Sequence, residues 1–289
     1  MRDNIITDVI IPAYRPGSEF SKTLSSLALQ VSGINRLTVI NTEEKYWDKA
    51  FETQFPGMEV RHITKDEFNH GTTRYEAAKR SDADIIVFMT QDAVPADDRL
   101  IEKLIAPIIS GEAAVSYARQ LPKEDADEIE RFTRAYNYPA GSKIKSADDL
   151  KELGIKTFFC SNVCAAYDKK IYDSLGGFPH PLDFNEDMIF AGKLIEAGYK
   201  ISYTAEAKVF HSHDYSGKEQ YERNYLIGKT QAEHPEVFAK YPSEGAGISM
   251  VKKTASHLIK AGKPHLLFKL VWLSGCKYLG YRAGKRSVK

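Results

Sequence analysis

The stretch Thr7-Asp8-Val9-Ile10-Ile11-Pro12 decides the fold, because it reads as a buried strand that ends at a proline. Arg36 to Asn41 and Asp84 to Met89 are two further short runs rich in β-branched residues. Such runs are typical of parallel strands that are covered on both faces. Helical stretches at residues 17–29 and 72–80 lie between them. This alternation predicts an α/β fold with a doubly wound parallel sheet.

Polar segments follow these three strands at the point where each strand ends. They are Pro12-Ala13-Tyr14, Asn41-Thr42-Glu43 and Thr90-Gln91-Asp92-Ala93. In doubly wound sheets, ligands bind beyond the carboxyl ends of the strands. We therefore expect a carboxylate and an aromatic ring to meet in one crevice there.

The remainder of the chain is less regular, and residues 121–156 show one charged helix near 124–134. We expect a strand at 157–160, a helix at 186–197 that ends at Gly198, and short strands at 200–203 and 207–210. From Met250 onward the pattern is helical, and Pro264 suits a first helical turn.

The composition is that of a globular protein, with 43% hydrophobic and 27% charged residues among 289. Three cysteines at no metal-ligand or disulfide spacing indicate reduced, packed thiols. The N-terminus lacks the features of a secretory signal, and no window of eighteen residues is apolar enough to span a bilayer. We therefore expect a cytoplasmic protein.

The net charge of +1 conceals an asymmetry along the chain. No acidic residue follows Glu244, whereas ten lysines and arginines do. Removing these ten from the 40 Lys and Arg leaves 30 against 39 acidic residues, so residues 1–244 carry about −9. The chain has an acidic body and a basic tail.

Three sets of side chains are candidates for chemistry. Asp92 ends a strand, Glu186 and Asp187 begin a predicted helix, and His211 and His213 alternate at the end of another strand. Each has a structural alternative: Asp92 as a turn or helix cap, the two acids as partners of the helix dipole, and each histidine as a packing residue. The case for function is that carboxylates and imidazoles occur together.

The chain resembles the family 2 glycosyltransferases, and within them the bacterial rhamnosyltransferases. The resemblance runs from residue 5 to about 230. The matching motifs are Ile10-Ile11-Pro12-Ala13-Tyr14, Phe68-Asn69-His70-Gly71-Thr72-Thr73-Arg74, Thr90-Gln91-Asp92-Ala93, Arg119-Gln120-Leu121-Pro122, Asn137-Tyr138-Pro139, Phe159-Cys160-Ser161-Asn162, Gly176-Gly177-Phe178, Glu186-Asp187-Met188 and His211-Ser212-His213. It implies a GT-A fold, in which a Rossmann-like mixed sheet has helices on both faces.

The resemblance also implies roles for individual residues. Those near the donor nucleotide are Pro12, Ala13, Tyr14, Asn41, Glu43, Arg74, Gln91 and Asp92, with Arg74 close to the diphosphate. Asp92, with His213 or His211, is expected to bind Mn²⁺ or Mg²⁺, and imidazole favours Mn²⁺. Asp187 is the expected catalytic base, with Glu186 beside it. Expected acceptor contacts are Arg119, Asn162 and Glu186.

The sequence departs from the wider family at two positions. Thr90 replaces the first aspartate of the Asp-X-Asp motif, which weakens or remodels the contact to metal or ribose there. Tyr75 replaces the asparagine of the Gly-X-X-Arg-Asn pattern, which leaves the donor selectivity open.

The basic, apolar tail has three interpretations. Lysines and residues such as Leu266, Phe268 and Trp272 suit the cytoplasmic face of a membrane, where lipid-linked glycan acceptors sit. Alternatively, the apolar residues pack on the catalytic domain or on a second subunit in a homo-oligomer. Nucleic-acid binding is a third interpretation, which no recognition motif supports.

Together these features predict an inverting glycosyltransferase that moves L-rhamnose from dTDP-L-rhamnose to a lipid-linked or growing cell-surface polysaccharide. The alternatives are the same fold with a UDP-hexose donor, or an inactive membrane-associated scaffold. We expect a catalytic domain at residues 1–230, with the donor part at about 1–120 and the acceptor part at 121–230, and a helical basic extension at 231–289.

Overall fold

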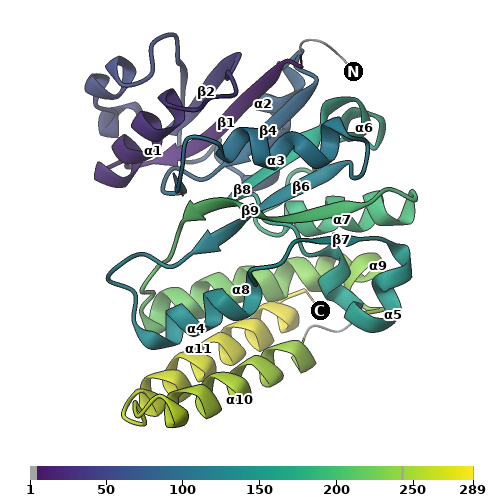
Figure 1. Cartoon of the computed structure of the whole chain (residues 1–289). Helices are drawn as coiled ribbons and strands as arrows, with labels where there is room; N and C mark the ends of the chain where they lie inside the picture. The colour runs from purple at the N-terminus through teal and green to yellow at the C-terminus, as the bar shows by residue number, and fades with distance from the viewer. Residues whose placement is uncertain (1–4, 242–243, 289) are drawn as a thin grey trace.

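The computed structural model describes residues 5–241 and 244–288, and its centre is one mixed sheet (Figure 1). The strand order is β3-β2-β1-β4-β8-β6-β9-β5, and β7 pairs with β9. The strands are β1 (Thr7–Tyr14), β2 (Arg36–Thr42), β3 (Glu59–Ile63), β4 (Ile85–Met89), β5 (Val94–Pro95), β6 (Val115–Leu121), β7 (Lys143–Lys145), β8 (Cys164–Asp168) and β9 (Ile201–Phe210).

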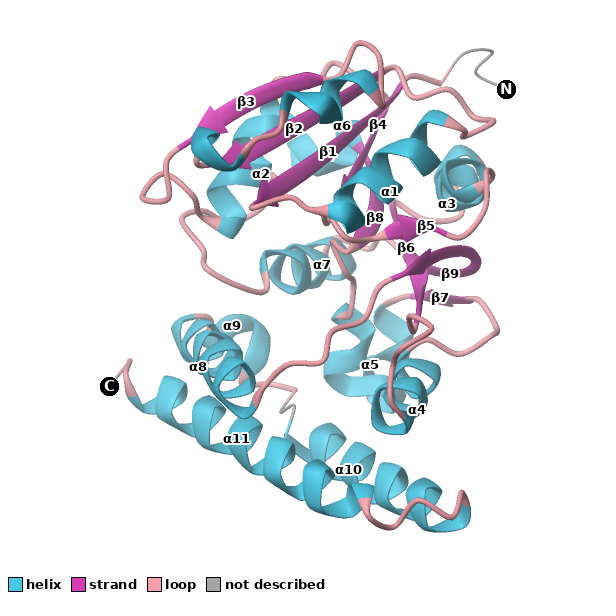
Figure 2. Cartoon of the chain, turned by 90° about the vertical axis from the view of Figure 1, so that its left-hand side faces the viewer, coloured by secondary structure: helices cyan, strands magenta, loops and turns pink. Residues whose placement is uncertain are grey.

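The helices cover both faces of this sheet and add a further layer. They are α1 (Ser18–Ala28), α2 (His70–Lys79), α3 (Leu100–Ile109), α4 (Glu128–Asn137), α5 (Leu150–Leu153), α6 (Lys169–Ser174), α7 (Glu186–Glu196), α8 (Gly217–Glu233), α9 (Pro235–Phe238), α10 (Glu244–Lys260) and α11 (Leu266–Arg286). Figures 1 and 2 both place α10 and α11 on the side of α8 and α4 that is remote from the sheet.

Side chains of the buried strands point alternately to the two faces of the sheet, and this explains why helices cover both faces. In β4, Val87 packs with α1 and α3 on one face, whereas Phe88 packs with α2, α6 and α7 on the other. Successive strand residues point to opposite faces, so a run that is apolar at every position needs a helical layer on each side. This is why continuous apolar runs, and not alternating ones, marked the central strands.

The predicted central strands and most predicted helices are present, but the sheet differs from the prediction in two ways. The three predicted strands, β1, β2 and β4, are parallel, as expected, and β3, which was not predicted, is parallel to β2. In contrast, β8 lies antiparallel between β4 and β6. The two short strands expected at 200–203 and 207–210 form one strand, β9. The sheet is therefore mixed. This agrees with the fold implied by the family resemblance, and not with the parallel sheet predicted from the alternation of strands and helices.

The strand predicted at residues 157–160 was wrong. Gly154–Phe158 forms a 3₁₀ helix, and Thr157 and Phe158 are buried within it. A short apolar run does not distinguish a strand from a buried turn by periodicity alone. Conversely, β8 went unpredicted because Cys164-Ala165-Ala166 lacks the β-branched residues that signal a strand.

The C-terminal residues fold back on the protein as helices. α11 packs along α8 through three glycines, Gly228, Gly280 and Gly284, whose Cα atoms lie against backbone carbonyls of the opposite helix. Small residues permit this close approach of two helices. The predicted boundary at residue 230 falls inside α8, and the division into domains stays a prediction. None of the helices in the described ranges is sufficiently long and apolar to cross a bilayer.

This packing makes a prediction about Gly284. A methyl group there would overlap the carbonyl oxygen of Tyr225, and the helices would have to separate. We expect Gly284→Ala to lower the free energy of unfolding by about 1–3 kcal/mol, as other overpacked cores do. Gly275→Ala on the open side of α11 is the control, where an added methyl meets nothing within 4 Å. Gly275→Ala should raise the free energy of unfolding by about 0.5–1 kcal/mol, because alanine loses less conformational freedom than glycine when a helix forms. Equal unfolding midpoints for the two variants would contradict the packing.

Candidate active site

One carboxylate and two imidazoles meet where β4 and β9 end. His213 Nε2 lies 3.2 Å from Asp92 Oδ2, and His211 Nε2 lies 3.7 Å from Asp92 Oδ1. The two Nε2 atoms are 3.0 Å apart. Three potential ligand atoms thus fall within 4.8 Å of one another. The sequence suggested this grouping, and the fold brings it together.

Gln91, the residue before Asp92, connects the ends of two neighbouring strands. The Gln91 side chain accepts from the Tyr14 N–H at 2.9 Å and donates to the Tyr14 carbonyl at 3.0 Å. Its amide thereby ties the end of β4 to the end of β1. Gln91 thus holds two strand ends together beside Asp92, and its contact with a donor stays a prediction.

The tautomer of His211 is set by Gln120 on β6. His211 Nδ1 lies 3.0 Å from Gln120 Oε1, and the same oxygen accepts from the Arg134 guanidinium. Because an amide oxygen can only accept hydrogen bonds, His211 Nδ1 must carry the proton. The unprotonated Nε2 of His211 therefore faces Asp92 and His213 with its lone pair. Burial also holds the pKa of His211 well below its usual range, so the ring is neutral. Such outer partners orient metal-binding imidazoles.

The same glutamine connects this cluster to the second pair of acids. Gln120 Nε2 donates to Ser161 Oγ at 3.0 Å. The next residue, Asn162, donates its backbone N–H to Asp187 Oδ2 at 3.2 Å and its side-chain amide to Glu186 Oε1 at 3.0 Å. His211 is therefore connected to Asp187 by hydrogen bonds through Gln120 to Ser161, by the peptide bond from Ser161 to Asn162, and by the Asn162 N–H.

The two adjacent acids differ in their ionisation. Glu186 is buried and pairs with Arg74 at 3.2 Å; burial opposes its ionisation, but Arg74, His70 and Asn162 together lower its pKa. Burial and the charge of Glu186 raise the pKa of Asp187 to about 7. A carboxylate with a pKa near neutrality is suited to accept a proton.

The N-terminus of α2 positions the loop that precedes these acids. Asn69 caps α2 through Thr72 N–H and also accepts from Leu182 N–H at 2.8 Å. Gly71 donates to the Leu182 carbonyl at 2.9 Å, and any side chain on it would overlap the Pro179 carbonyl. Tyr75, the departure from the family pattern, stacks on His180 in the same loop with ring centroids 3.9 Å apart.

Basic side chains face the Asp92 cluster from several elements. Arg134, Arg223 and Lys123 all act to lower the pKa values of His211 and His213 after the larger effect of burial. Arg223 on α8 lies over the rings of Tyr215 and Phe184, at 5.6 and 4.6 Å from their centroids. It therefore spans from the histidine side of the site to the loop before Glu186.

Lys277 on α11 belongs to the same basic environment. Burial lowers its pKa, and Glu130, Arg223 and Arg134 are its charged neighbours. A half-buried lysine next to two arginines indicates that α11 contributes to the electrostatics of the site. The surroundings favour an anionic ligand.

The other residues predicted for the donor lie at strand ends. Tyr14 is exposed, and its ring packs edge-on against Tyr46 with centroids 5.8 Å apart, whereas Pro12 and Ala13 are more buried. Asn41 is buried and donates to His62 Nδ1 at 3.0 Å, and Glu43 pairs with Lys45 at 2.7 Å.

Arg74 and Arg119, which were predicted to contact the donor and the acceptor, have side-chain neighbours within the protein. Arg74 is buried against Glu186, which commits its guanidinium to the second acid pair. Arg119 lies near Tyr203 of β9; burial raises the pKa of Tyr203, and the Arg119 charge opposes this shift. Neither position tests the predicted contacts with a donor or acceptor.

Sequence reasoning missed Gln120, Arg134 and Arg223. Gln120 stood inside the motif Arg119-Gln120-Leu121-Pro122, and its buried amide on a strand was the available signal. Arg134 and Arg223 sit on helices whose orientation no local pattern specifies. Only the packing of α4 and α8 brings them to the site.

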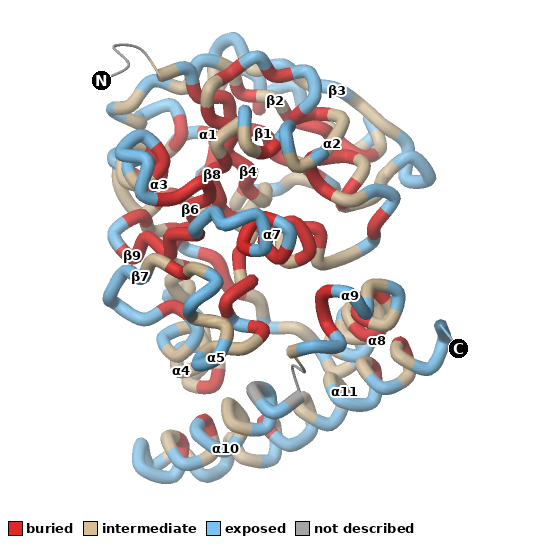
Figure 3. Tube along the Cα trace, turned by 90° about the vertical axis from the view of Figure 1, so that its right-hand side faces the viewer, coloured by how far each residue is buried: buried red, intermediate tan, exposed pale blue. Residues whose placement is uncertain are grey.

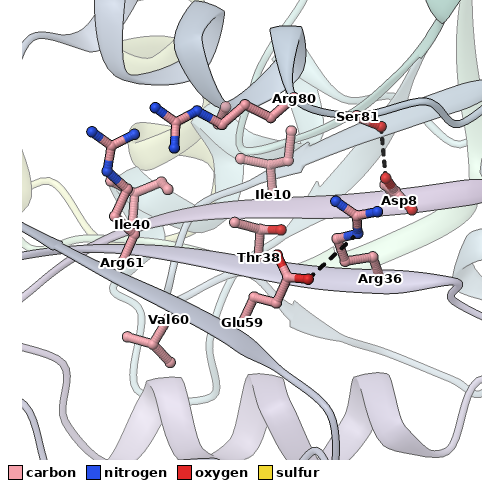
Figure 4. Close-up of a pocket in the computed structure, with 11 residues that line it drawn as sticks. Asp8, Ile10, Arg36, Thr38, Ile40, Glu59, Val60, Arg61, Arg80 and Ser81 are labelled. Atoms are coloured by element: carbon pink, nitrogen blue, oxygen red, sulfur yellow. Dashed lines mark hydrogen bonds and ion pairs between the residues drawn. The ribbon is translucent and has the colours of Figure 1, made fainter.

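A separate cavity of about 120 Å³ lies between α2 and strands β1 to β3 (Figure 4). Arg36, Arg61 and Arg80 line it, and Glu59 pairs with Arg36. Asp8 and Arg36 stand at the amino ends of their strands. The cavity is thus remote from the carboxyl ends that carry Asp92, and it forms no part of the candidate active site.

The buried pair of Arg74 and Glu186 yields a stability prediction. Arg74→Met leaves the Glu186 charge buried without its cation, and we expect a loss of about 3–5 kcal/mol in the free energy of unfolding. Neutralising the acid as well, in Arg74→Met with Glu186→Gln, should recover most of that loss. Urea unfolding measures both variants, with exposed Arg80→Met as a control that changes stability by about 0.5 kcal/mol or less. A double variant no more stable than Arg74→Met would contradict the ion pair.

Similar proteins agree with this architecture. The chain is 36% identical over 279 residues to the O-antigen chain rhamnosyltransferase RfbN of Salmonella typhimurium, covering 96% of this chain and 88% of that protein. It is 33% identical over 280 residues to the O-antigen chain rhamnosyltransferase WbaN of Salmonella anatum, with the same coverage.

Two solved structures share the fold at low sequence identity. The mannosyltransferase PcManGT from Pyrobaculum calidifontis, in complex with GDP-Man and Mn²⁺, has a TM-score of 0.59 and 12% identity, over 99% of this chain and 76% of that one. S. aureus TarS 1-349 in complex with UDP-GlcNAc has a TM-score of 0.54 and 14% identity, over 98% of this chain and 91% of that one.

The model of Glycosyl transferase family 2 matches residues 8–176, which are more than half of the chain. This match and the two relatives confirm the expected family and its GT-A fold. The chain belongs to glycosyl transferase family 2.

Proposed function

We propose that this protein transfers L-rhamnose from dTDP-L-rhamnose, with inversion, to a lipid-linked or growing cell-surface polysaccharide. The rhamnosyltransferase relatives motivate the sugar and the class of acceptor. The observation that carries the proposal is the connection of the Asp92 cluster to Asp187 through Gln120 and the Ser161–Asn162 segment. This connection supports a single site in which the Asp92 cluster faces the donor and Asp187 faces the acceptor.

Asp92, His213 and His211 are the residues that would hold a divalent cation. The carboxylate suits Mg²⁺ or Mn²⁺, and the two imidazole nitrogens favour Mn²⁺. When bound, the cation neutralises charge that builds on the departing nucleoside diphosphate. The donor set fits this role, because Gln120 leaves the His211 lone pair free and directs it at the cluster.

The surrounding cations support the binding of a diphosphate at the same place. Arg223 and Lys277 supply positive charge from α8 and α11, and Arg134 of α4 adds to it while it pairs with Glu130 at 2.6 Å. Thr90 Oγ1 is buried, and no described residue or its backbone bonds to it. A donor hydroxyl or phosphate oxygen is the partner we propose for it. Residues 1–120 and 121–230 would then supply the donor and acceptor parts.

Asp187 is the base in this proposal. The acceptor oxygen attacks the anomeric carbon on the face opposite the diphosphate, its proton moves to Asp187, and the bond from carbon to the diphosphate oxygen breaks. Glu186 stays ionised through Arg74 and raises the proton affinity of Asp187. Asn162 orients both acids through its two hydrogen bonds.

A panel of nucleotide sugars tests the proposed donor. We expect metal-dependent turnover of dTDP-L-rhamnose to exceed that of UDP-glucose, UDP-galactose and UDP-N-acetylglucosamine, measured as nucleoside diphosphate released. EDTA should abolish the activity, and Mn²⁺ should restore it. His213→Ala should weaken Mn²⁺ binding in titration calorimetry. His234→Ala, which changes a half-buried histidine paired with Glu236, should leave Mn²⁺ binding unchanged.

The outcomes of the panel separate the alternatives. Preference for a UDP-sugar would replace the proposed donor and keep the enzyme class. No turnover with any donor, in protein that binds Mn²⁺, would favour a scaffold and overturn the proposal.

Asp187→Asn tests the base. The amide keeps the shape but cannot accept the proton, so kcat should fall by about 10²–10⁴-fold while donor binding persists. In the unaltered enzyme, kcat/KM should rise with pH and level off above about 7, because only the ionised form of Asp187 acts as a base. The variant should lack this rise. Near-native turnover by Asp187→Asn, or a profile without a rise near neutrality, would reject the assignment.

A further inference from the structure

The outer face of α11 exposes a stripe of large apolar side chains. Its members are Phe268, Val271, Trp272, Tyr278 and Leu279, with exposed fractions of 83, 67, 61, 58 and 61%. They recur at helical spacings of three and four residues, so they share one side of the helix. Figure 3 shows α11 as a largely exposed helix at the margin of the molecule.

Most of this stripe is not needed to pack α11; of its members, Trp272 also lies against Gly217 of α8. The inner side of α11 already packs on α8 through Gly280 and Gly284, and Leu270 joins Leu258 of α10 in a small core. Exposing several large apolar side chains together is unfavourable unless another surface covers them. The outer face therefore points to a binding partner.

The same two helices, α10 and α11, carry exposed cations that form no ion pair with a described residue. Lys252 and Lys260 on α10 and Arg282 and Arg286 on α11 are exposed, and none forms an ion pair with a described residue. By contrast, Lys263 pairs with Glu128 and Lys269 pairs with Asp127 and Asp214, at 2.7 to 3.0 Å. The paired lysines hold the helices to the body, and the unpaired cations remain available to an external anion.

The charge pattern identifies the partner. No acidic residue follows Glu244, so a second copy docked through the same face would bring cation against cation. An apolar stripe flanked by cations fits the interface of an anionic phospholipid bilayer, where rings and aliphatic chains enter the headgroup region. We infer that α10 and α11 form a docking surface for an anionic membrane.

The position of α11 gives this surface a consequence for the enzyme. Its inner side packs on α8, which carries Arg223, and Lys277 of α11 itself faces Arg134 and Arg223. A membrane bound to the outer face would therefore lie on the far side of α11 from Arg223 of α8. This placement would bring the enzyme close to a lipid-linked acceptor, an argument that rests on the proposed function.

Flotation with vesicles of defined composition tests the surface. We expect the full chain to float with phosphatidylcholine vesicles that contain phosphatidylglycerol and to remain at the bottom with phosphatidylcholine alone. Phe268→Ser with Val271→Ser should reduce the partition coefficient by at least about tenfold, or about 1.4 kcal/mol. Arg282→Gln with Arg286→Gln should reduce it about 30-fold, at about 1 kcal/mol for each charge.

Matched variants elsewhere on the surface serve as controls. Leu29→Ser with Val31→Ser removes two exposed apolar side chains beside α1, and Lys49→Gln with Lys170→Gln removes two exposed cations. Both controls should float like the unaltered protein. Circular dichroism and unfolding midpoints confirm that every variant is folded.

Two results would overturn the inference. One is equal flotation of the outer-face variants and their controls. The other is a dimer in light scattering that Phe268→Ser with Val271→Ser dissociates, in protein that does not float.

Hydrolysis of the donor in solution reports on the proposed function independently of vesicles. Loss of flotation with hydrolysis intact is the expected behaviour of the outer-face variants, whereas absent hydrolysis in floating protein would count against the proposed function alone.

Discussion

The candidate site depends on the side-chain amide of Gln120. It is buried, and it uses its full hydrogen-bonding capacity: Oε1 accepts from His211 and Arg134, and Nε2 donates to Tyr138 and Ser161. A buried amide with satisfied partners is rigid, because breaking any one bond leaves a desolvated polar atom. This one group fixes the tautomer of His211 and holds the loop that contacts Asp187.

The sheet topology makes that arrangement possible. β8 runs antiparallel to β4 and β6, so its beginning lies beside their carboxyl ends, with Cys164 opposite Met89. The loop before β8 is thereby brought to the segment that carries Asp92, and Thr90 N–H donates to the Val163 carbonyl at 3.1 Å. Had β8 been parallel, Ser161 and Asn162 would lie at the opposite edge of the sheet.

Charge distinguishes two carboxylates that are adjacent in sequence. The Arg74 guanidinium stabilises Glu186 as an anion, and the fixed negative charge then raises the pKa of its neighbour. Pairs of acids whose pKa values are pushed apart by their surroundings are typical of sites that move protons. The α8 and α11 layer adds cations from the other side, so the C-terminal helices belong to the electrostatics of the site as well as to its support.

The sequence alone was sufficient for the family, the central strands and the acids and histidines of the site, because these features are local. A strand such as Thr7–Tyr14 is encoded by a continuous apolar run, and Asp92, Asp187 and the histidines stand inside short motifs. The tertiary structure decided which of these groups meet and what else meets them. Arg74 turned to Glu186, and Arg134 and Arg223 reached the histidines, because helix packing sets the direction of a side chain and no neighbouring residue in the sequence does.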